Sequence, residues 1–96
     1  MLAITPVLDV TPAASGTVIE AHVVAERPTP LRWRLVVISG APRNQSQIAQ
    51  GGRTDGSSPA VLSRVMVTGS GDAVLEVYQD DILVSETRRR FGAEAP

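Results

Sequence analysis

The sequence predicts an all-β protein, an immunoglobulin-like antiparallel β-sandwich of about seven strands. Apolar residues rich in Val and Ile recur at a spacing of two, which is typical of strands with one buried face. Clusters of Gly, Pro, Asn, Asp and Ser interrupt these runs at regular intervals. No long amphipathic stretch is left over for a helix. Short strands joined by turns rather than by helical crossovers favour two packed antiparallel sheets.

Each strand can be placed along the chain from this pattern. The expected strands are residues 2–10, 17–26, 31–39, 44–50, 60–68, 73–79 and 82–90. The segments between them are TPAASG, RPTP, SGAPRN, GGRTDGSSP, TGSGD and QDD, all rich in turn-forming residues. Pro6 cannot donate a ladder hydrogen bond, so the first strand fits the edge of a sheet. We expect one domain over residues 1–96, because this length leaves no room for a second core.

Alternation along the strands then assigns side chains to two faces. The residues expected in the core are Ile19, Ala21, Val23, Ala25, Leu31, Trp33, Leu35, Val37, Val61, Val65, Val67, Ala73, Leu75 and Val77. The residues expected on the outer faces include Glu20, His22, Glu26, Arg32, Arg34, Arg64, Glu76 and Tyr78. The only tryptophan of the chain is thus predicted to point inward between two outward arginines.

Composition removes several classes of function. The formal charge of -1 argues against nucleic acid as a partner. There is no cysteine, which excludes disulfides, thiolate metal sites and thiol nucleophiles. The segment MLAITPVLDV has neither a basic leader nor a long apolar core, so we expect no signal peptide or membrane span in this chain. All nine positive residues are arginines, whose permanent charge and planar donors suit carboxylates.

Residues suited to catalysis are almost absent. His22 is the only histidine, and its place between Glu20 and Val24 is typical of a strand surface rather than of a ligand or a base. Asp80 and Asp81, and also Asp72, are expected in turns for backbone reasons. The segments GSGD and GGRTDG lack the spacing and the following helix of a phosphate loop. We therefore expect no enzyme activity, no cofactor and no metal ligand.

Charge is expected to collect on one outer face. In an immunoglobulin-like order the third, sixth and seventh strands are neighbours, so their arginines share a surface. In the last strand, alternation allows either Arg88 with Arg90, or Arg89 alone, to join it. One interpretation is a solvated face whose arginines pair with Glu76, Glu86 and their neighbours, each pair contributing at most ~1 kcal/mol. The other is a cationic patch that attracts an acidic polypeptide. The candidate binding residues are Arg32, Arg34, Tyr78, Arg88, Arg89 and Arg90.

Three segments carry a resemblance to a known family. The run LRWRLVVIS, then NQSQIAQ, then VLSRVMVTGSGDAVLEVYQDDILVSETRRRF resembles, in order and spacing, the small periplasmic inhibitors of curli amyloid assembly, the CsgC and CsgH family. The resemblance covers about residues 16 to 91, and the alphaproteobacterial CsgH type looks closer. The enterobacterial relatives carry a Cys-x-Cys pair where this chain has Leu31 and Trp33, so no thiol role carries over.

This resemblance implies an immunoglobulin-like sandwich that resides in the periplasm after its signal is removed. It implies that the protein has no catalytic activity. We also expect a monomer with no membrane or nucleic acid partner. Its implied client is the disordered curli major subunit, which it would keep from nucleating fibrils through transient, charge-guided contacts.

Other interpretations remain open. The chain could be a structural or adhesion sandwich domain of a larger surface assembly. A carbohydrate-binding module needs an aromatic platform, and the only aromatic residues are Trp33, Tyr78 and Phe91. The client could also add to an exposed sheet edge. The NQSQIAQ strand is expected to be a polar edge strand; alternatively, Asn44, Gln45, Gln47 and Gln50 mimic the client's amide ladders.

Overall fold

The computed structural model describes residues 3–40, 43, 45–57 and 61–92. Seven strands form within these ranges, and every pairing between them is antiparallel. They are β1 (Ile4–Ala13), β2 (Gly16–Ala25), β3 (Leu31–Ser39), β4 (Ser46–Thr54), β5 (Ser63–Val67), β6 (Gly71–Gln79) and β7 (Ile82–Phe91). No helix of a length and hydropathy suited to crossing a membrane occurs in these ranges.

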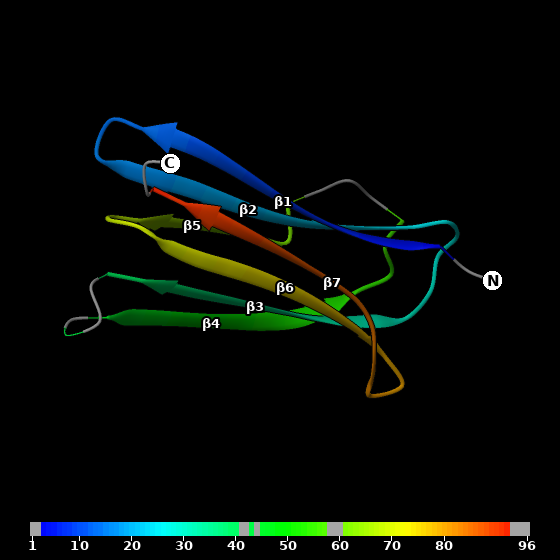
Figure 1. Ribbon diagram of the computed structural model, residues 1–96. Coiled ribbons are helices and arrows are strands. Elements are labelled where there is room, and N and C mark those ends of the chain that lie inside the picture. Colours follow the sequence, from blue (N-terminus) through cyan, green and yellow to red (C-terminus); the bar gives the residue numbers. More distant parts are fainter. Residues whose placement is uncertain (1–2, 41–42, 44, 58–60, 93–96) are drawn as a thin grey trace.

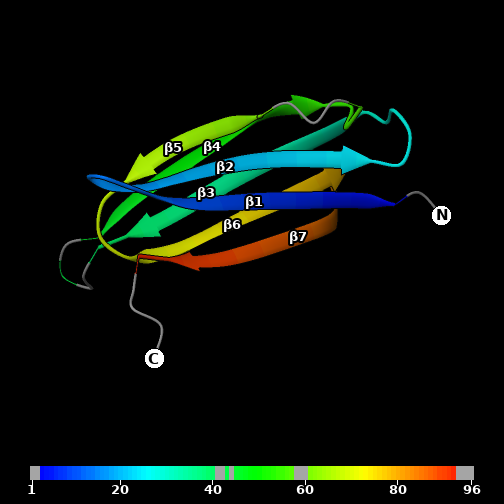
Figure 2. The ribbon, with the colours of Figure 1, turned by 90° about the horizontal axis from the view of Figure 1, so that it is seen from above.

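The strands form two stacked sheets, as Figures 1 and 2 show. One sheet has the order β1-β2-β5 and the other has the order β4-β3-β6-β7. The predicted all-β sandwich is therefore confirmed. So is the expected adjacency of the third, sixth and seventh strands. The strand that carries Pro6 lies at a sheet edge, as the missing N–H of proline requires.

The core fills the space between the sheets, as alternation predicted. Ile19, Leu35 and Leu75 are fully buried, and Trp33 is only 8% exposed. Leu8 and Phe91 join the core from β1 and from the end of β7. Val61 was wrongly assigned to it. That side chain is 44% exposed, because β5 begins only at Ser63 and Leu62 packs against the core instead.

Several predicted boundaries were also wrong. The fourth strand continues through GGRT to Thr54, because every residue from Ser46 onward has a partner on β3. β1 likewise continues to Ala13 and pairs there with Gly16. Asp72 lies within β6 rather than in a turn. Residues 2, 44 and 60, which the predicted strands included, lie outside the described ranges.

The β6–β7 hairpin places charge at one end of the four-stranded sheet. Asp80 and Asp81 form its turn with φ values of 53° and 64°, as their predicted turn role requires. Two consecutive left-handed residues match the right-handed twist of the flanking strands. The turn thereby brings two carboxylates close to the beginning of β3.

Candidate binding face on the four-stranded sheet

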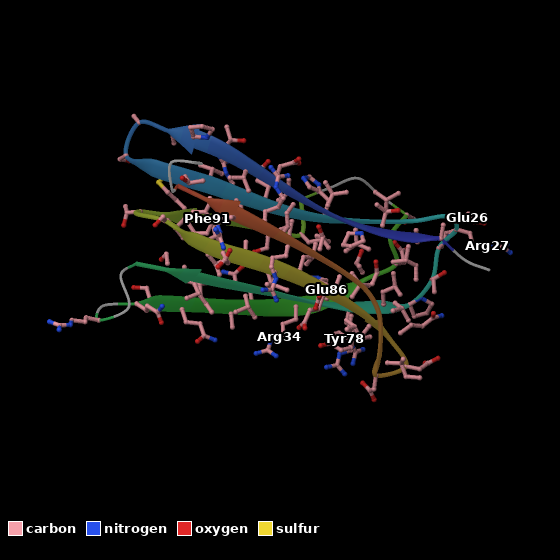
Figure 3. The ribbon with its side chains drawn as sticks, viewed as in Figure 1. Glu26, Arg27, Arg34, Tyr78, Glu86 and Phe91 are labelled. Carbon is pink, nitrogen blue, oxygen red and sulfur yellow. The ribbon has the colours of Figure 1, made fainter. Side chains whose placement is uncertain are left out.

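Arg32 and Arg34 project from the outer face of the four-stranded sheet, as alternation predicted. Both side chains belong to exposed positions of β3, while Trp33 between them is buried. On the neighbouring β6, Arg32 lies opposite Tyr78 and Arg34 lies opposite Glu76. Figure 3 shows Arg34 and Tyr78 pointing away from the other sheet. The structure thus brings these predicted site residues together.

The pairing of β7 decides which of its arginines share this face. Arg88 lies opposite Val74 and Arg90 lies opposite Asp72, at the same alternation as Arg34 and Glu76. Arg89 has the opposite alternation. Its Nη1 atom donates a hydrogen bond of 3.1 Å to the backbone oxygen of Leu8 on β1. Arg88 and Arg90 therefore join Arg32 and Arg34, whereas Arg89 connects the two sheets.

Arg53 is a residue of this face that the sequence analysis missed. It lies on β4 directly opposite Arg32, and its side chain is exposed. Arg53 was expected in a turn, within the segment GGRTDGSSP. Continuing the alternation of the strand through GGRT would have found it. We call Arg32, Arg34 and Arg53 the arginine cluster.

Two hollows of the surface are lined by arginines of the cluster together with Trp33. The larger, of about 360 Å³, is lined by all three arginines, by Trp33 and by Ala49, Gln50, Gly51 and Gly52. The smaller, of about 240 Å³, lies between the β3 arginines, Tyr78 and Asp81, with Trp33 again in its wall. Gly51 lies opposite Arg34 and contributes no side chain, so the larger hollow stays open.

Gly52 has a separate role on the inner face. It lies opposite Trp33, and a Cβ atom added there would stand 3.2 Å from the indole nitrogen. The indole therefore occupies space that a side chain at position 52 would fill. The two strands that carry the arginine cluster, β3 and β4, are thus closely packed on their inner face.

The ion pairs of this face differ from those expected. Arg32 contacts Asp81 at 2.7 Å, and Arg90 contacts Asp72 at 3.5 Å. All four side chains are substantially exposed, so these pairs contribute little stability. Within the described ranges, Arg34, Arg53 and Arg88 form no ion pair, and Glu76 and Glu86 pair with none of the arginines. Two arginines of this face therefore pair with nearby aspartates rather than with these two glutamates.

Glu76 instead forms a hydrogen bond with Tyr78. The phenol hydroxyl donates a hydrogen bond of 3.1 Å to its carboxylate. This bond stabilises the neutral phenol and raises the pKa of Tyr78, while the charge of Arg34 acts in the opposite direction. Glu76 also lies opposite Glu86 of β7. Negative charge thus lies beside the arginine cluster, on the parts of β6 and β7 that are level with Arg34.

β4 is a polar edge strand, as expected for NQSQIAQ. Gln47 lies opposite Ile38 on the outer face. Gln50 lies on the inner face of β4, opposite Leu35. Its amide oxygen accepts a hydrogen bond from the Ser63 hydroxyl of the other sheet. Because these two amides face opposite ways, they do not form one ladder that mimics a client. Asn44, part of the same hypothesis, lies outside the described residues.

Comparison with known proteins gives one informative match. No family model matches the chain, and no curated protein sequence does either. The solution structure of CsgH from R. palustris matches it with a TM-score of 0.67 over 92% of each chain. The chain has a CsgH-like fold. At 13% sequence identity this likeness shows the fold alone.

Proposed function

We propose that this protein is a non-catalytic, monomeric inhibitor of curli amyloid nucleation in the periplasm. Its arginine cluster binds the disordered curli major subunit through transient contacts. The observation that carries the proposal is the direct opposition of Arg32 and Arg53 beside an open hollow. The CsgH-like fold and the resemblance of the strand segments to the curli inhibitors support a curli-related partner.

Opposed arginines are unfavourable for the isolated protein. Like charges that face each other across two strands destabilise a sheet, and Arg53 has no carboxylate contact among the described residues to offset this. An acidic chain bound over the hollow removes the repulsion by bringing its own carboxylates. Guanidinium groups suit this role because they bind carboxylates through planar paired donors.

Side-chain contacts also avoid a hazard of binding an amyloid precursor. An exposed sheet edge presents unpaired N–H and C=O groups, and a client that pairs with them is held in the conformation that fibrils extend. The arginine cluster projects from the face of the sheet and offers no such ladder. It can therefore hold a disordered chain without templating a strand.

The experiment measures the lag of curli major subunit fibrillation by thioflavin fluorescence. Wild-type protein at a substoichiometric ratio should lengthen the lag. The double variant Arg32→Glu with Arg34→Glu should lose most of this effect, and adding Arg53→Glu should remove the remainder. Arg27→Glu with Arg43→Glu is the matched control, because it makes the same charge change at exposed positions outside the sheets. Circular dichroism verifies that each variant is folded.

Two results would contradict the proposal. If the folded double variant inhibits as well as wild type, the arginine cluster does not bind the client. If the control pair loses as much inhibition as the cluster variant, net charge rather than this surface is responsible. No inhibition by wild type, together with stable self-association in sedimentation, would favour the structural or adhesion domain instead.

Ionic strength separates the arginine cluster from edge pairing on β4. Attraction between exposed charges is screened within about 8 Å at physiological salt, so inhibition through the arginine cluster should weaken as salt is raised. Backbone pairing with an edge strand is much less sensitive to salt. Inhibition that persists after correction for the client's own salt response would indicate the edge.

A further inference from the structure

A second cluster of charged side chains lies on the outer face of the three-stranded sheet, away from the arginine cluster. Asp9 on β1 stands directly opposite Glu20 on β2, and His22 follows two residues later on the same face of β2. One oxygen of each carboxylate and one ring nitrogen of His22 all lie within 4.8 Å of one another. Asp9 is exposed, whereas Glu20 and His22 are partly buried.

The His22 ring is held against this cluster. Its Nε2 atom lies 3.0 Å from Oδ2 of Asp9, and the side chain is only 16% exposed. The nitrogen itself is shielded from solvent. His22 lies on the outer face of β2, as expected, but its side chain is largely covered rather than facing solvent. The ring is thus largely buried, with its Nε2 atom in contact with Asp9.

The charges of the cluster are only partly balanced. Two carboxylates facing each other across antiparallel strands repel. Arg64 lies opposite Glu20 on β5 and approaches it at 3.6 Å through its Nε atom. Its side chain is 68% exposed, so it can turn into solvent without disturbing the core. A divalent cation between the carboxylates would balance both charges at once.

We propose that Asp9, Glu20 and His22 form a binding site for a divalent transition-metal ion, with zinc as the representative. One imidazole nitrogen and two carboxylate oxygens are a donor set that zinc accepts, with a fourth position left for water. The imidazole favours zinc over magnesium and calcium, which prefer oxygen ligands. The site lies on a different sheet from the arginine cluster and does not depend on the proposed function.

The geometry requires only small movements. Two ligands of a tetrahedral zinc ion, bonded at about 2.0–2.1 Å, stand roughly 3.3 Å apart. The 3.0 Å between Asp9 and His22 is already close to this separation. The other ligand atoms close the remaining gap by rotation of carboxylate side chains, which are 56% and 30% exposed for Asp9 and Glu20. A metal ion binds to Nε2 only when that nitrogen carries no proton.

The test uses the intact chain and zinc chloride. His22 is the only histidine and there is no cysteine, so ring signals in nuclear magnetic resonance report on one residue. Calorimetry should show one zinc per chain. The ring signals should shift to saturation at the same stoichiometry, while magnesium chloride at equal concentration should leave them unchanged.

Variants make the assignment specific. Asp9→Asn and His22→Gln should each weaken zinc binding by roughly tenfold or more, since altering even the outer partners of a metal site costs that much. Arg64→Gln should tighten binding, because it removes the cation that competes for Glu20. Asp72→Asn, which changes a carboxylate paired with an arginine on the other sheet, is the control and should bind zinc as wild type does.

Unshifted His22 signals at saturating zinc would show that the cluster is an ion-paired surface only. Undiminished binding by His22→Gln would place the metal elsewhere. If His22→Gln does not fold, the exposed Asp9→Asn and the tightening by Arg64→Gln decide the question. Neither variant touches the arginine cluster, so this test fails or succeeds independently of the fibrillation assay.

Discussion

The two outer faces of the sandwich both carry opposed like charges, but they balance them differently. On the four-stranded sheet, Arg53 faces Arg32, and of these two arginines only Arg32 has a carboxylate contact among the described residues. On the three-stranded sheet, Asp9 faces Glu20, but each carboxylate has a nitrogen contact, Asp9 with His22 and Glu20 with Arg64. Each carboxylate of the second face thus has a nitrogen contact within the protein, whereas Arg53 on the first face has no carboxylate contact among the described residues.

This difference shows that net charge is a poor guide to a binding surface. The chain as a whole has a formal charge of -1. Strand register decides which charges oppose each other and which find partners. A face that keeps an unbalanced pair retains a small repulsion, and a charged partner can relieve it.

The largest expected effect is on the free energy of unfolding, and it comes from removing the indole of Trp33, which packs beneath the arginine cluster. Trp33→Ala should lower the free energy of unfolding by about 3–5 kcal/mol, because it leaves a cavity where the indole packs behind Gly52. Met66→Ala on the outer face of the other sheet removes a side chain that is 58% exposed. Urea denaturation followed by circular dichroism measures both variants.

Met66→Ala should stay within about 0.5 kcal/mol of wild type. A Trp33→Ala variant as stable as this control would mean that the four-stranded sheet does not depend on the indole for its packing.

A smaller effect tests the repulsion itself. Arg53→Glu should raise the free energy of unfolding by about 0.2–1 kcal/mol, because it replaces an opposed like-charge pair with an opposite-charge pair. The same variant should inhibit fibrillation less than wild type. Trp33 fluorescence during urea denaturation measures the stability of the variant.

Arg27→Glu provides the comparison, because Arg27 is exposed between β2 and β3 and has no cross-strand partner. Its unfolding free energy should match wild type. A loss of stability in Arg53→Glu would mean that the opposition of Arg32 and Arg53 carries no repulsive cost.

The sequence predicts the first face better than the second. Alternation along β3 was enough to place Arg32 and Arg34 outward and Trp33 inward, because each pattern lies within one strand. Arg53 was missed because Gly51 and Gly52 resemble a turn, and only pairing with β3 shows that they are strand. The Asp9 and His22 contact joins two strands, so it depends on a register that the pattern of either strand leaves open.

The same limit applies to β7. Alternation restricted its arginines to Arg88 with Arg90, or Arg89 alone, but the choice required the pairing with β6. The prediction that Val61 lies in the core was wrong for a related reason. Its position has the inward alternation, but it precedes the start of β5. Periodicity therefore gives the faces of a strand, while its ends and its partners come from tertiary contacts.

The smallest expected effect is a change in the pKa of Tyr78, the only tyrosine of the chain. This pKa reports on the electric field of the arginine cluster. The hydrogen bond to Glu76 raises the pKa of Tyr78 above its ordinary value near 10. Ionisation breaks this bond, so its stabilising contribution is present at neutral pH and is lost as pH rises through the raised pKa. Ultraviolet absorbance of the phenolate follows the titration directly.

Variants around Tyr78 should shift its pKa in opposite directions. Glu76→Gln should return the pKa toward 10, because the carboxylate acceptor is the main cause of the increase. Arg34→Gln should raise the pKa further, since the guanidinium favours the phenolate. Glu86→Gln should lower the pKa only slightly, because its charge is the weakest of these influences. If Arg34→Gln leaves the titration unchanged, the arginine cluster does not extend its field across β3 to β6, and Tyr78 should be removed from the binding face.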